Sequence, residues 1–316
     1  MIIDLTIVIP YYNESKTIIK TLDMIANQSY SPKEVILVNS SSTDNTSTII
    51  DEWIKEKEKE KENDKIQFKN IHKNTFLPSS SKNIGVKYSN SEYVAFMDCG
   101  LLFDNSWIEM QYNKILNYKF DVIFGTVELE GDTNFDVCCV SQTYGYKKIS
   151  ECIPGTLLRK SVFNEIGKFE EFRAGYDPFW RQKVKKANIN YFVPRHRITK
   201  YDGINYASNF SQLISKTIQY THASESLIKS YKNNFLLLIV FLLFCFVIMK
   251  PLILPYLFVF YLICRGYIFP IIKSWKITSL LYSPNILLGL PIVGILIDSA
   301  KIIGTIKSYI KPQRQI

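Results

Sequence analysis

Polar side chains follow two short apolar runs near the start of the chain, at the points where each run ends. Carboxylates in such positions can accept hydrogen bonds from ribose hydroxyls or from a base N–H, and an amide carbonyl accepts a base N–H without adding charge. A proline and a tyrosine at the end of the first run can present backbone and ring to a base. The candidate nucleoside-binding residues are Pro10, Tyr11, Asn13, Glu14, Asn39 and Asp44.

A lysine–asparagine pair and a later aspartate extend this set. Lys82 and Asn83 open a segment with helical spacing, where a cation and backbone N–H groups suit a diphosphate. Asp98 follows a third apolar run, and hard cations such as Mg²⁺ or Mn²⁺ take one or two carboxylates together with phosphate oxygens. These residue types suit a phosphate-binding edge, and Asp98 is a candidate metal ligand, a role that the family resemblance described below implies. A surface lysine remains the alternative for Lys82, and a helix-capping or first-turn carboxylate for Glu14.

Short β-branched runs alternate with amphipathic helical segments, and this alternation must position the polar residues. It is typical of a doubly wound, mostly parallel α/β sheet with right-handed crossovers. Loops that leave the carboxyl ends of neighbouring parallel strands face the same crevice, where such sheets bind ligands. The expected strands are Leu5–Ile9, Glu34–Val38, Tyr93–Met97 and Val122–Leu129, and the expected helices are Ser15–Asn27, Thr43–Ile54, Lys82–Tyr88 and Tyr176–Ala187.

Five motifs in order make the chain resemble the family-2 glycosyltransferases over roughly residues 4–200. The family's first two strands end in V-I-P-x-Y-N-E and V-D-D-G-S-T-D, and its later motifs are R-N-x-G, a strand before D-x-D, and a G-x-F turn followed by an E-D pair. The resemblance implies a GT-A-type, Rossmann-like fold that binds a nucleotide sugar. The matching segments are Val8–Glu14, Val38–Asp44, Ser81–Gly85, Phe96–Asp98 and Pro154–Asp177.

The resemblance also assigns roles on the acceptor side of the site. It implies that Asp177 is the general base of inverting transfer, which deprotonates the acceptor hydroxyl. Trp180 and Arg181 resemble the family's acceptor-side tryptophan and arginine. An N-cap for the helix that begins near Pro178 remains the alternative for Asp177. The Q-x-x-R-W motif of processive polysaccharide synthases is absent, which favours a non-processive enzyme.

The chain departs from the family pattern at four positions that are usually acidic. Gly100 stands where the second acid of D-x-D is expected, which places dependence on a divalent cation in doubt. Asn39 and Ser40 replace the acidic pair after the second strand, and Tyr176 replaces the first acid of E-D. These losses favour one rival interpretation, a non-catalytic membrane scaffold or partner protein with a degenerate transferase fold.

The C-terminal part of the chain is apolar and basic. Ten Lys or Arg and one acid lie between Lys229 and Ile316, a balance of +9 that equals the formal charge of the whole chain. Basic residues that flank apolar runs suit the anionic cytoplasmic leaflet and argue against nucleic acid as a partner. The expected runs are Phe235–Met249, Leu252–Cys264 and Ser279–Ile297, which predict two to three membrane spans.

These observations predict three regions: a catalytic domain over 1–200, a juxtamembrane connector over 201–232, and a membrane anchor over 233–316. No signal peptide precedes the first strand, so the catalytic domain is expected to face the cytoplasm. The function expected is inverting, non-processive transfer of a sugar from a nucleotide-diphosphate donor to a membrane-held, lipid-linked acceptor in cell-surface glycan synthesis. The expected partners are the donor, that acceptor and the bilayer.

Overall fold

The computed structural model describes residues 1–59, 66–73, 75–128, 131–145, 151–172, 174–195, 199–201, 206–228, 238–239, 251–273 and 283–311. The chain forms two compact units. The first consists mainly of residues 1–128 and 149–202, and the second of residues 129–148 and 203–314.

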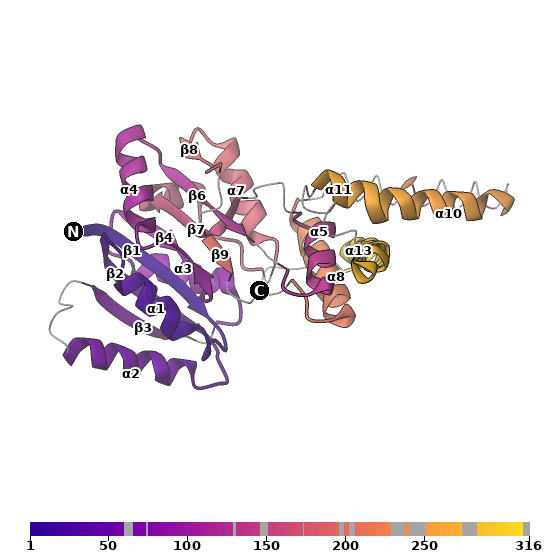
Figure 1. The fold of residues 1–316 in the computed structure, drawn as a ribbon. Helices are drawn as coiled ribbons and strands as arrows, with labels where there is room; N and C mark the ends of the chain where they lie inside the picture. Colours follow the sequence, from indigo (N-terminus) through magenta and orange to yellow (C-terminus); the bar gives the residue numbers. More distant parts are fainter. Residues whose placement is uncertain are drawn as a thin grey trace. The chain divides into compact units, whose positions relative to one another are not determined.

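A mixed, mostly parallel sheet organises the first unit (Figure 1). Its order is β3-β2-β1-β4-β7-β6-β9-β5, and β8 pairs with β6. The four strands β3, β2, β1 and β4 are parallel, whereas β7 runs antiparallel to both of its neighbours. The strands are β1 (Ile2–Tyr11), β2 (Ser31–Ser40), β3 (Gln67–Lys73), β4 (Tyr93–Phe96), β5 (Leu101–Leu102), β6 (Val122–Glu128), β7 (Glu151–Arg159), β8 (Tyr191–Phe192) and β9 (Thr199–Tyr201).

Helices cover both faces of this sheet because successive strand residues point to opposite sides. Ile7 and Ile9 pack on one face with buried residues of α1, α2 and α4, while Val8 packs on the other with α3, α6 and α7. The predicted doubly wound arrangement is therefore confirmed. The helices of this unit are α1 (Ile18–Ala26), α2 (Thr46–Lys59), α3 (Pro78–Tyr88), α4 (Trp107–Tyr118), α6 (Lys160–Ile166) and α7 (Tyr176–Lys186).

The described part of the second unit is helical and includes a piece of chain that was expected in the catalytic domain. Residues 129–148 belong to this unit because Cys138 and Cys139 of α5 are buried with Leu290 and Val293 of α13. In the sequence these residues lie between β6 and β7, and the later division between the two units falls at Asp202. The helices are α5 (Asn134–Gln142), α8 (Phe210–Ile228), α10 (Leu254–Ile263) continued by the π-helical η2 (Cys264–Ile268) and α11 (Phe269–Lys273), and α13 (Pro284–Ile310); the 3₁₀ turn η1 (Pro251–Ile253) precedes α10.

Two helical stretches of the second unit are long and apolar enough to cross a membrane. They are Leu254–Lys273 and Pro284–Ile310, by length and composition. Arg265 of the first stretch pairs with Asp298 of the second through Nε and Nη2, at 2.7 and 3.0 Å. Charged groups inside apolar helices are costly unless they are paired, and this pair meets that requirement. The first predicted run, Phe235–Met249, lies almost wholly outside the described residues.

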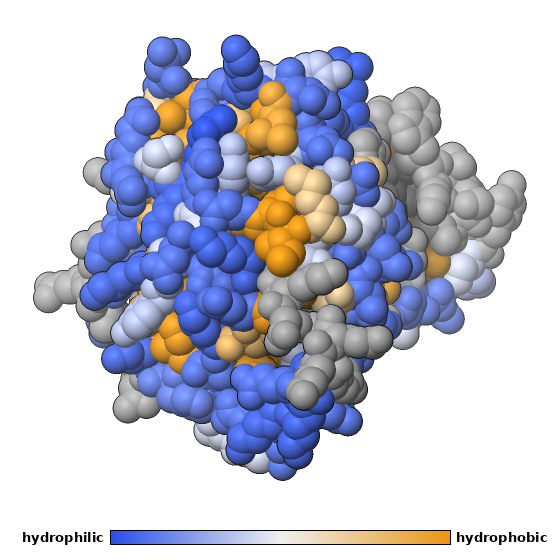
Figure 2. Space-filling model, turned by 90° about the vertical axis from the view of Figure 1, so that its left-hand side faces the viewer, coloured by the Kyte–Doolittle hydropathy of each residue, from blue (hydrophilic) through white to orange (hydrophobic). Residues whose placement is uncertain are grey.

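Exposed apolar side chains are distributed unevenly. The face of the molecule in Figure 2 is mostly hydrophilic, and its hydrophobic residues form small separate patches. By contrast, large exposed hydrophobic side chains are frequent along α10, α11 and α13. Helices that are apolar on their exposed sides favour contact with lipid or with another protein.

Candidate active site

The carboxyl ends of β1, β2 and β4 meet at one edge of the sheet, as the sequence predicts. Tyr11 lies beside Asn39 in the parallel ladder of β1 and β2. Val8 lies beside Phe96 in the ladder of β1 and β4, so Asp98 follows β4 at the same edge. The loops that carry the candidate binding residues therefore leave the sheet together.

Asn13 joins the first two loops to each other. Its Oδ1 accepts hydrogen bonds from the backbone N–H groups of Thr43 and Asp44, at 2.8 and 3.3 Å. Its φ of 56° is left-handed, a conformation that asparagine adopts more readily than most residues. Asn13 thus shapes the site by linking the loop after β1 to the loop after β2.

Asn39 and Asp44 also form hydrogen bonds within these loops. Asn39 Oδ1 accepts the backbone N–H of Ser42 at 2.7 Å. Asp44 accepts N–H groups of Thr46 and Ser15. Burial alone would raise the pKa of Asp44, but these hydrogen bonds hold it below its ordinary value. Both side chains therefore keep the loop in shape.

The two adjacent tyrosines have different environments. Tyr11 is 2% exposed and donates to Asn70 Oδ1 at 2.8 Å, and burial raises its pKa. Pro10 is buried as well. Tyr12 is 52% exposed and offers an accessible ring at this edge. The sequence prediction overlooked Tyr12, although the V-I-P-x-Y-N-E motif aligns its tyrosine with this position.

Asp98 lies close enough to Glu14 to influence the pKa of the Glu14 carboxyl. Burial, followed by the nearby carboxylates of Asp98 and Asp44, raises the pKa of Glu14 above its ordinary value, despite a hydrogen bond from the Thr17 hydroxyl. Like charges disfavour each other's ionised forms. The carboxylates predicted to bind the donor are therefore gathered at one place, which is a common property of ligand sites.

Asp98 is paired with a buried ammonium group. Lys82 Nζ lies 2.7 Å from Asp98 Oδ1 and 3.5 Å from the Tyr176 hydroxyl, and the Lys82 side chain is 1% exposed. Burial alone would lower the pKa of Lys82, but the charge of Asp98 more than offsets this and raises it. The alternative of a surface lysine is excluded. Lys82 is a fixed internal cation at the edge where β1, β2 and β4 end, which we call the donor edge because the sequence predicts that the donor binds there.

A divalent cation is the cofactor implied by the family's D-x-D motif, and the donor edge supplies few ligands for one. Asp98 is one carboxylate, its Oδ1 is bonded to Lys82, and Gly100 has no side chain to offer. Among the described residues, no group of three or more His, Cys, Asp and Glu side chains is arranged to hold a metal ion. Asp98 would therefore hold a dication only together with the phosphate oxygens of a bound diphosphate, an arrangement that Mg²⁺ commonly adopts.

Asn83 has a bond pattern that differs from the predicted diphosphate contact. Its Nδ2 donates to the carbonyl of Phe169, and its Oδ1 accepts the N–H of the same residue, both at 2.9 Å. This bidentate contact attaches α3 to the Gly167-Lys168-Phe169 turn. The contact uses one N–H and one carbonyl lone pair of the amide, and it gives Asn83 a structural role at this turn.

Asp177 lies in a network of opposite charges at the start of α7. Its Oδ2 accepts the N–H of Ile153 at 3.1 Å, and its Oδ1 accepts a bond from Arg181 Nε. Arg181 Nη1 lies 3.1 Å from Glu151, the first residue of β7. The N-cap of α7 is Gly175, so the capping role proposed as the alternative for Asp177 does not hold. The carboxylate is fixed in position by two elements and is 24% exposed.

Trp180 does not fit its predicted contact with the acceptor. Its side chain is fully buried, and Nε1 donates to the carbonyl of Gly167 at 2.8 Å. The ring packs in an aromatic cluster with Phe163 and Phe169, with ring centroids 6.0 and 5.2 Å apart. Arg181, one residue on, is the accessible member of this pair, with its side chain 17% exposed.

The donor and acceptor sides of the site lie within electrostatic reach of each other. Burial raises the pKa of Tyr176 to about 12, the carboxylates of Asp98 and Asp177 add to this rise, and Lys82 opposes it. Burial also raises the pKa of the Cys152 thiol, on which the charges of Asp177 and Asp98 both act. The side chains predicted to hold the donor and to act as base therefore converge.

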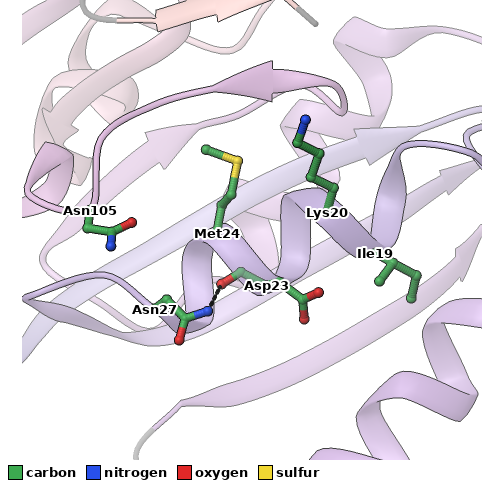
Figure 3. A pocket seen from close by; sticks show the side chains of 6 residues that line it. All are labelled: Ile19, Lys20, Asp23, Met24, Asn27 and Asn105. Carbon is green, nitrogen blue, oxygen red and sulfur yellow. Dashed lines mark hydrogen bonds between the residues drawn. The ribbon is translucent and has the colours of Figure 1, made fainter.

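A separate open depression lies on the outer side of α1. Its lining includes Lys20, Asp23 and Asn27, and the Asn27 amide donates to the Asp23 carbonyl (Figure 3). None of the predicted site residues lines it. The convergent polar groups, rather than this depression, mark the candidate active site.

Comparisons with known proteins agree with this geometry. The chain is 35% identical over 106 residues to an uncharacterized glycosyltransferase of Rickettsia bellii, covering 34% of this chain and 14% of that relative. It is 24% identical over 247 residues to the glycosyltransferase GlyG of Streptococcus pneumoniae, covering 68% and 79% of the two chains. The chain thus spans most of GlyG but about one seventh of the Rickettsia protein.

The fold is also shared with a solved structure, the mannosyltransferase PcManGT of Pyrobaculum calidifontis in complex with GDP-Man and Mn²⁺. The TM-score is 0.51 at 15% identity, with 68% of this chain and 61% of that chain covered. The family model described as glycosyl transferase family 2 matches residues 6–167, from β1 to the end of α6. The chain is therefore a member of glycosyl transferase family 2, as its motifs predict.

Proposed function

We propose that this protein transfers one sugar, with inversion, from a nucleotide-diphosphate donor to a membrane-held, lipid-linked acceptor. The observation that carries the proposal is the convergence of Glu14, Asp98 and Lys82 with Asp177 at one end of the sheet. A nucleotide-binding edge and a fixed carboxylate are the two parts that inverting transfer needs.

The chemistry assigned to these groups is a single displacement. Asp177 accepts the proton of the acceptor hydroxyl while the hydroxyl oxygen forms a bond to the anomeric carbon of the sugar. The bond from that carbon to the diphosphate oxygen breaks on the opposite face, and the nucleoside diphosphate leaves at the edge near Lys82. Because the base must lie within hydrogen-bond reach of the hydroxyl, the anchoring of Asp177 by Ile153 and Arg181 supports the role.

The second unit supports an acceptor in the bilayer. Its two long apolar stretches expose hydrophobic side chains, and the basic residues of the C-terminal region suit an anionic leaflet. Attachment to the membrane raises the effective concentration of a lipid-linked acceptor at the site. We place the catalytic unit on the cytoplasmic side, where nucleotide sugars are made.

The test uses the full chain in membranes with a panel of UDP-, GDP- and dTDP-sugars and a lipid extract. We expect release of one nucleoside diphosphate that depends on the lipid, and a lipid product heavier by a single sugar. The anomeric configuration of the product should be opposite to that of the donor. Retention of configuration, or a ladder of added sugars, would contradict the inverting, non-processive proposal; no release with any donor would contradict the transferase itself.

A further inference from the structure

Charged side chains one helical turn apart lie along one face of α7. Asp177, Arg181 and Lys185 follow each other at intervals of four residues, and side chains at this spacing are neighbours on a helix surface. Glu151, the first residue of β7, contacts both cations: it accepts a hydrogen bond from Lys185 Nζ and lies 3.1 Å from Arg181 Nη1. These side chains therefore form a row of alternating charge, in the order Asp177, Arg181, Glu151 and Lys185.

The guanidinium of Arg181 is shared between Asp177 and Glu151. Its Nε donates to Asp177 Oδ1, and its Nη1 reaches Glu151 Oε1 at 3.1 Å. The side chains of Asp177, Arg181 and Glu151 are 24, 17 and 21% exposed, so salt and water screen these contacts less than they screen surface ion pairs. Burial alone would lower the pKa of Arg181, but the charges of Asp177 and Glu151 raise it, so the guanidinium stays charged.

This sharing leaves part of the Asp177 carboxylate available to a substrate. An ionised carboxylate has about four lone-pair sites. In Asp177, Oδ1 accepts from Arg181 and Oδ2 accepts the N–H of Ile153 at 3.1 Å. An arginine that faces a single carboxylate commonly bonds both of its oxygens as a bidentate pair. Such a pair would take a further site on Oδ2 and crowd the oxygen atoms that an incoming hydroxyl must reach.

We propose that Glu151 is a positioning residue for sugar transfer: by holding Nη1 of Arg181, it keeps the guanidinium from forming a bidentate pair with Asp177 and leaves that carboxylate able to accept the proton of the acceptor hydroxyl. The inference rests on the proposed function, in which Asp177 is the base. Arg181 then acts through Asp177 rather than on the acceptor. Lys185 bonds the same oxygen of Glu151 and holds it in place.

The test measures kcat and KM of the full chain in membranes, with the nucleotide sugar and the lipid extract that give turnover. Glu151→Ala removes the partner of Nη1. We expect kcat to fall about tenfold and both KM values to stay within about threefold, because a misdirected base slows the chemical step without loosening substrate binding. Glu151→Gln keeps an oxygen that can accept the Nη1 bond and should retain kcat within about threefold.

The matched control is Glu170→Ala. The Glu170 side chain is also 21% exposed, and it pairs with Lys183 of the same helix at 2.8 Å. Its removal therefore costs α7 an ion pair of similar exposure without touching Arg181, and kcat should match that of wild type.

A double-variant cycle shows whether Glu151 acts through Arg181. In Arg181→Met protein no guanidinium is left to hold, so adding Glu151→Ala should change kcat by less than about twofold. An equal loss of kcat with and without Arg181 would overturn the inference. Wild-type kcat in Glu151→Ala, or a Glu151→Gln protein as slow as Glu151→Ala, would overturn it too. A raised acceptor KM with unchanged kcat would assign Arg181 to the acceptor and contradict the inference as well.

Failure of the inference differs from failure of the proposed function. Wild-type turnover in Asp177→Asn, or no turnover by wild type with any donor, contradicts both. A slow Asp177→Asn beside a Glu151→Ala of wild-type kcat contradicts the inference alone. Melting temperatures identify a variant that fails to fold. If Glu151→Ala is such a variant, Arg181→Lys decides, because an ammonium cannot bond the two carboxylates as a fork. We expect kcat to fall about tenfold in Arg181→Lys, and wild-type kcat would overturn the inference.

Discussion

Asn83→Ala distinguishes a structural role from a ligand-binding role at a position where the sequence and the structure disagree. The motif match predicts that Asn83 contacts the diphosphate. The structure instead gives it two hydrogen bonds to the backbone of Phe169, each 2.9 Å long. Phe169 is fully buried, and its ring packs against those of Phe96 and Trp180 with centroids 5.1 and 5.2 Å away. Loss of the amide should therefore loosen the turn that seats this ring.

The size of the effect follows from those contacts. Each net hydrogen bond contributes about 1 kcal/mol, and a buried backbone group left without a partner costs about 1–3 kcal/mol. Because the Phe169 N–H and C=O both lose a partner, we expect unfolding of the catalytic unit to become easier by about 2–4 kcal/mol. For a unit of this size that corresponds to a fall in melting temperature of roughly 5–12 °C.

The assay is urea unfolding followed by tryptophan fluorescence, since Trp180 lies in the affected cluster. The matched control is Asn27→Ala, which removes one exposed hydrogen bond, to the Asp23 carbonyl at 2.9 Å (Figure 3), and should cost less than about 0.5 kcal/mol. Nucleotide affinity, measured well below the melting temperature, should stay within about threefold of wild type. An Asn83→Ala protein with unchanged stability and at least tenfold weaker nucleotide binding would refute this reasoning.

Three further predictions concern other positions. Burial alone would raise the pKa of Glu34, but hydrogen bonds from Lys69 and other groups lower it. The ionised carboxylate should therefore stabilise the folded state above about pH 4.3, the ordinary pKa of glutamate. This stabilisation should be lost as the pH falls through the lower pKa that Glu34 has in the folded state. Acid-unfolding curves should therefore show a weaker pH dependence in Glu34→Gln, and an unchanged curve would contradict this. Tyr12→Ala should weaken nucleotide binding about tenfold if the exposed ring stacks on the base. Tyr11→Phe should instead lower the free energy of unfolding by about 1–2 kcal/mol and leave nucleotide affinity unchanged. Weaker nucleotide binding in Tyr11→Phe but not in Tyr12→Ala would reverse the two roles. Trp180→Phe should destabilise the catalytic unit, seen as a lower urea midpoint, and leave the acceptor KM unchanged; a raised KM at unchanged stability would return this residue to the acceptor side.

The strands that carry the donor loops could be predicted because their sequences are continuous apolar runs. Such runs are typical of parallel strands buried on both faces, and β1, β2 and β4 appear where expected, with ends shifted by up to three residues. The edge strand β3 was missed because Gln67–Lys73 is mostly polar and only partly buried. The antiparallel pairing of β7 and the inclusion of residues 129–148 in the second unit depend on contacts distant in sequence, which local periodicity does not contain.

The clustering of the candidate residues could be predicted better than their contacts. The motif intervals place Asp98 and Tyr176, the neighbour of Asp177, around the same ammonium group, that of Lys82. Whether an amide faces a ligand or a neighbouring loop depends on tertiary hydrogen bonds, so the partners of Asn83 were not visible in the sequence. The burial of Trp180 was hidden for the same reason, since a tryptophan on a short polar helix suits a ligand surface and a core equally well.

The role of Asp177 is tested most directly by turnover at saturating donor. Nucleoside diphosphate release by full-length protein in membranes is compared among wild type, Asp177→Asn and Glu165→Gln, an exposed acid on the neighbouring helix α6. We predict that Asp177→Asn lowers kcat by at least about a hundredfold with donor affinity within about threefold of wild type, and that Glu165→Gln matches wild type. An Asp177→Asn protein that turns over at the wild-type rate would contradict the assignment of this carboxylate as the base.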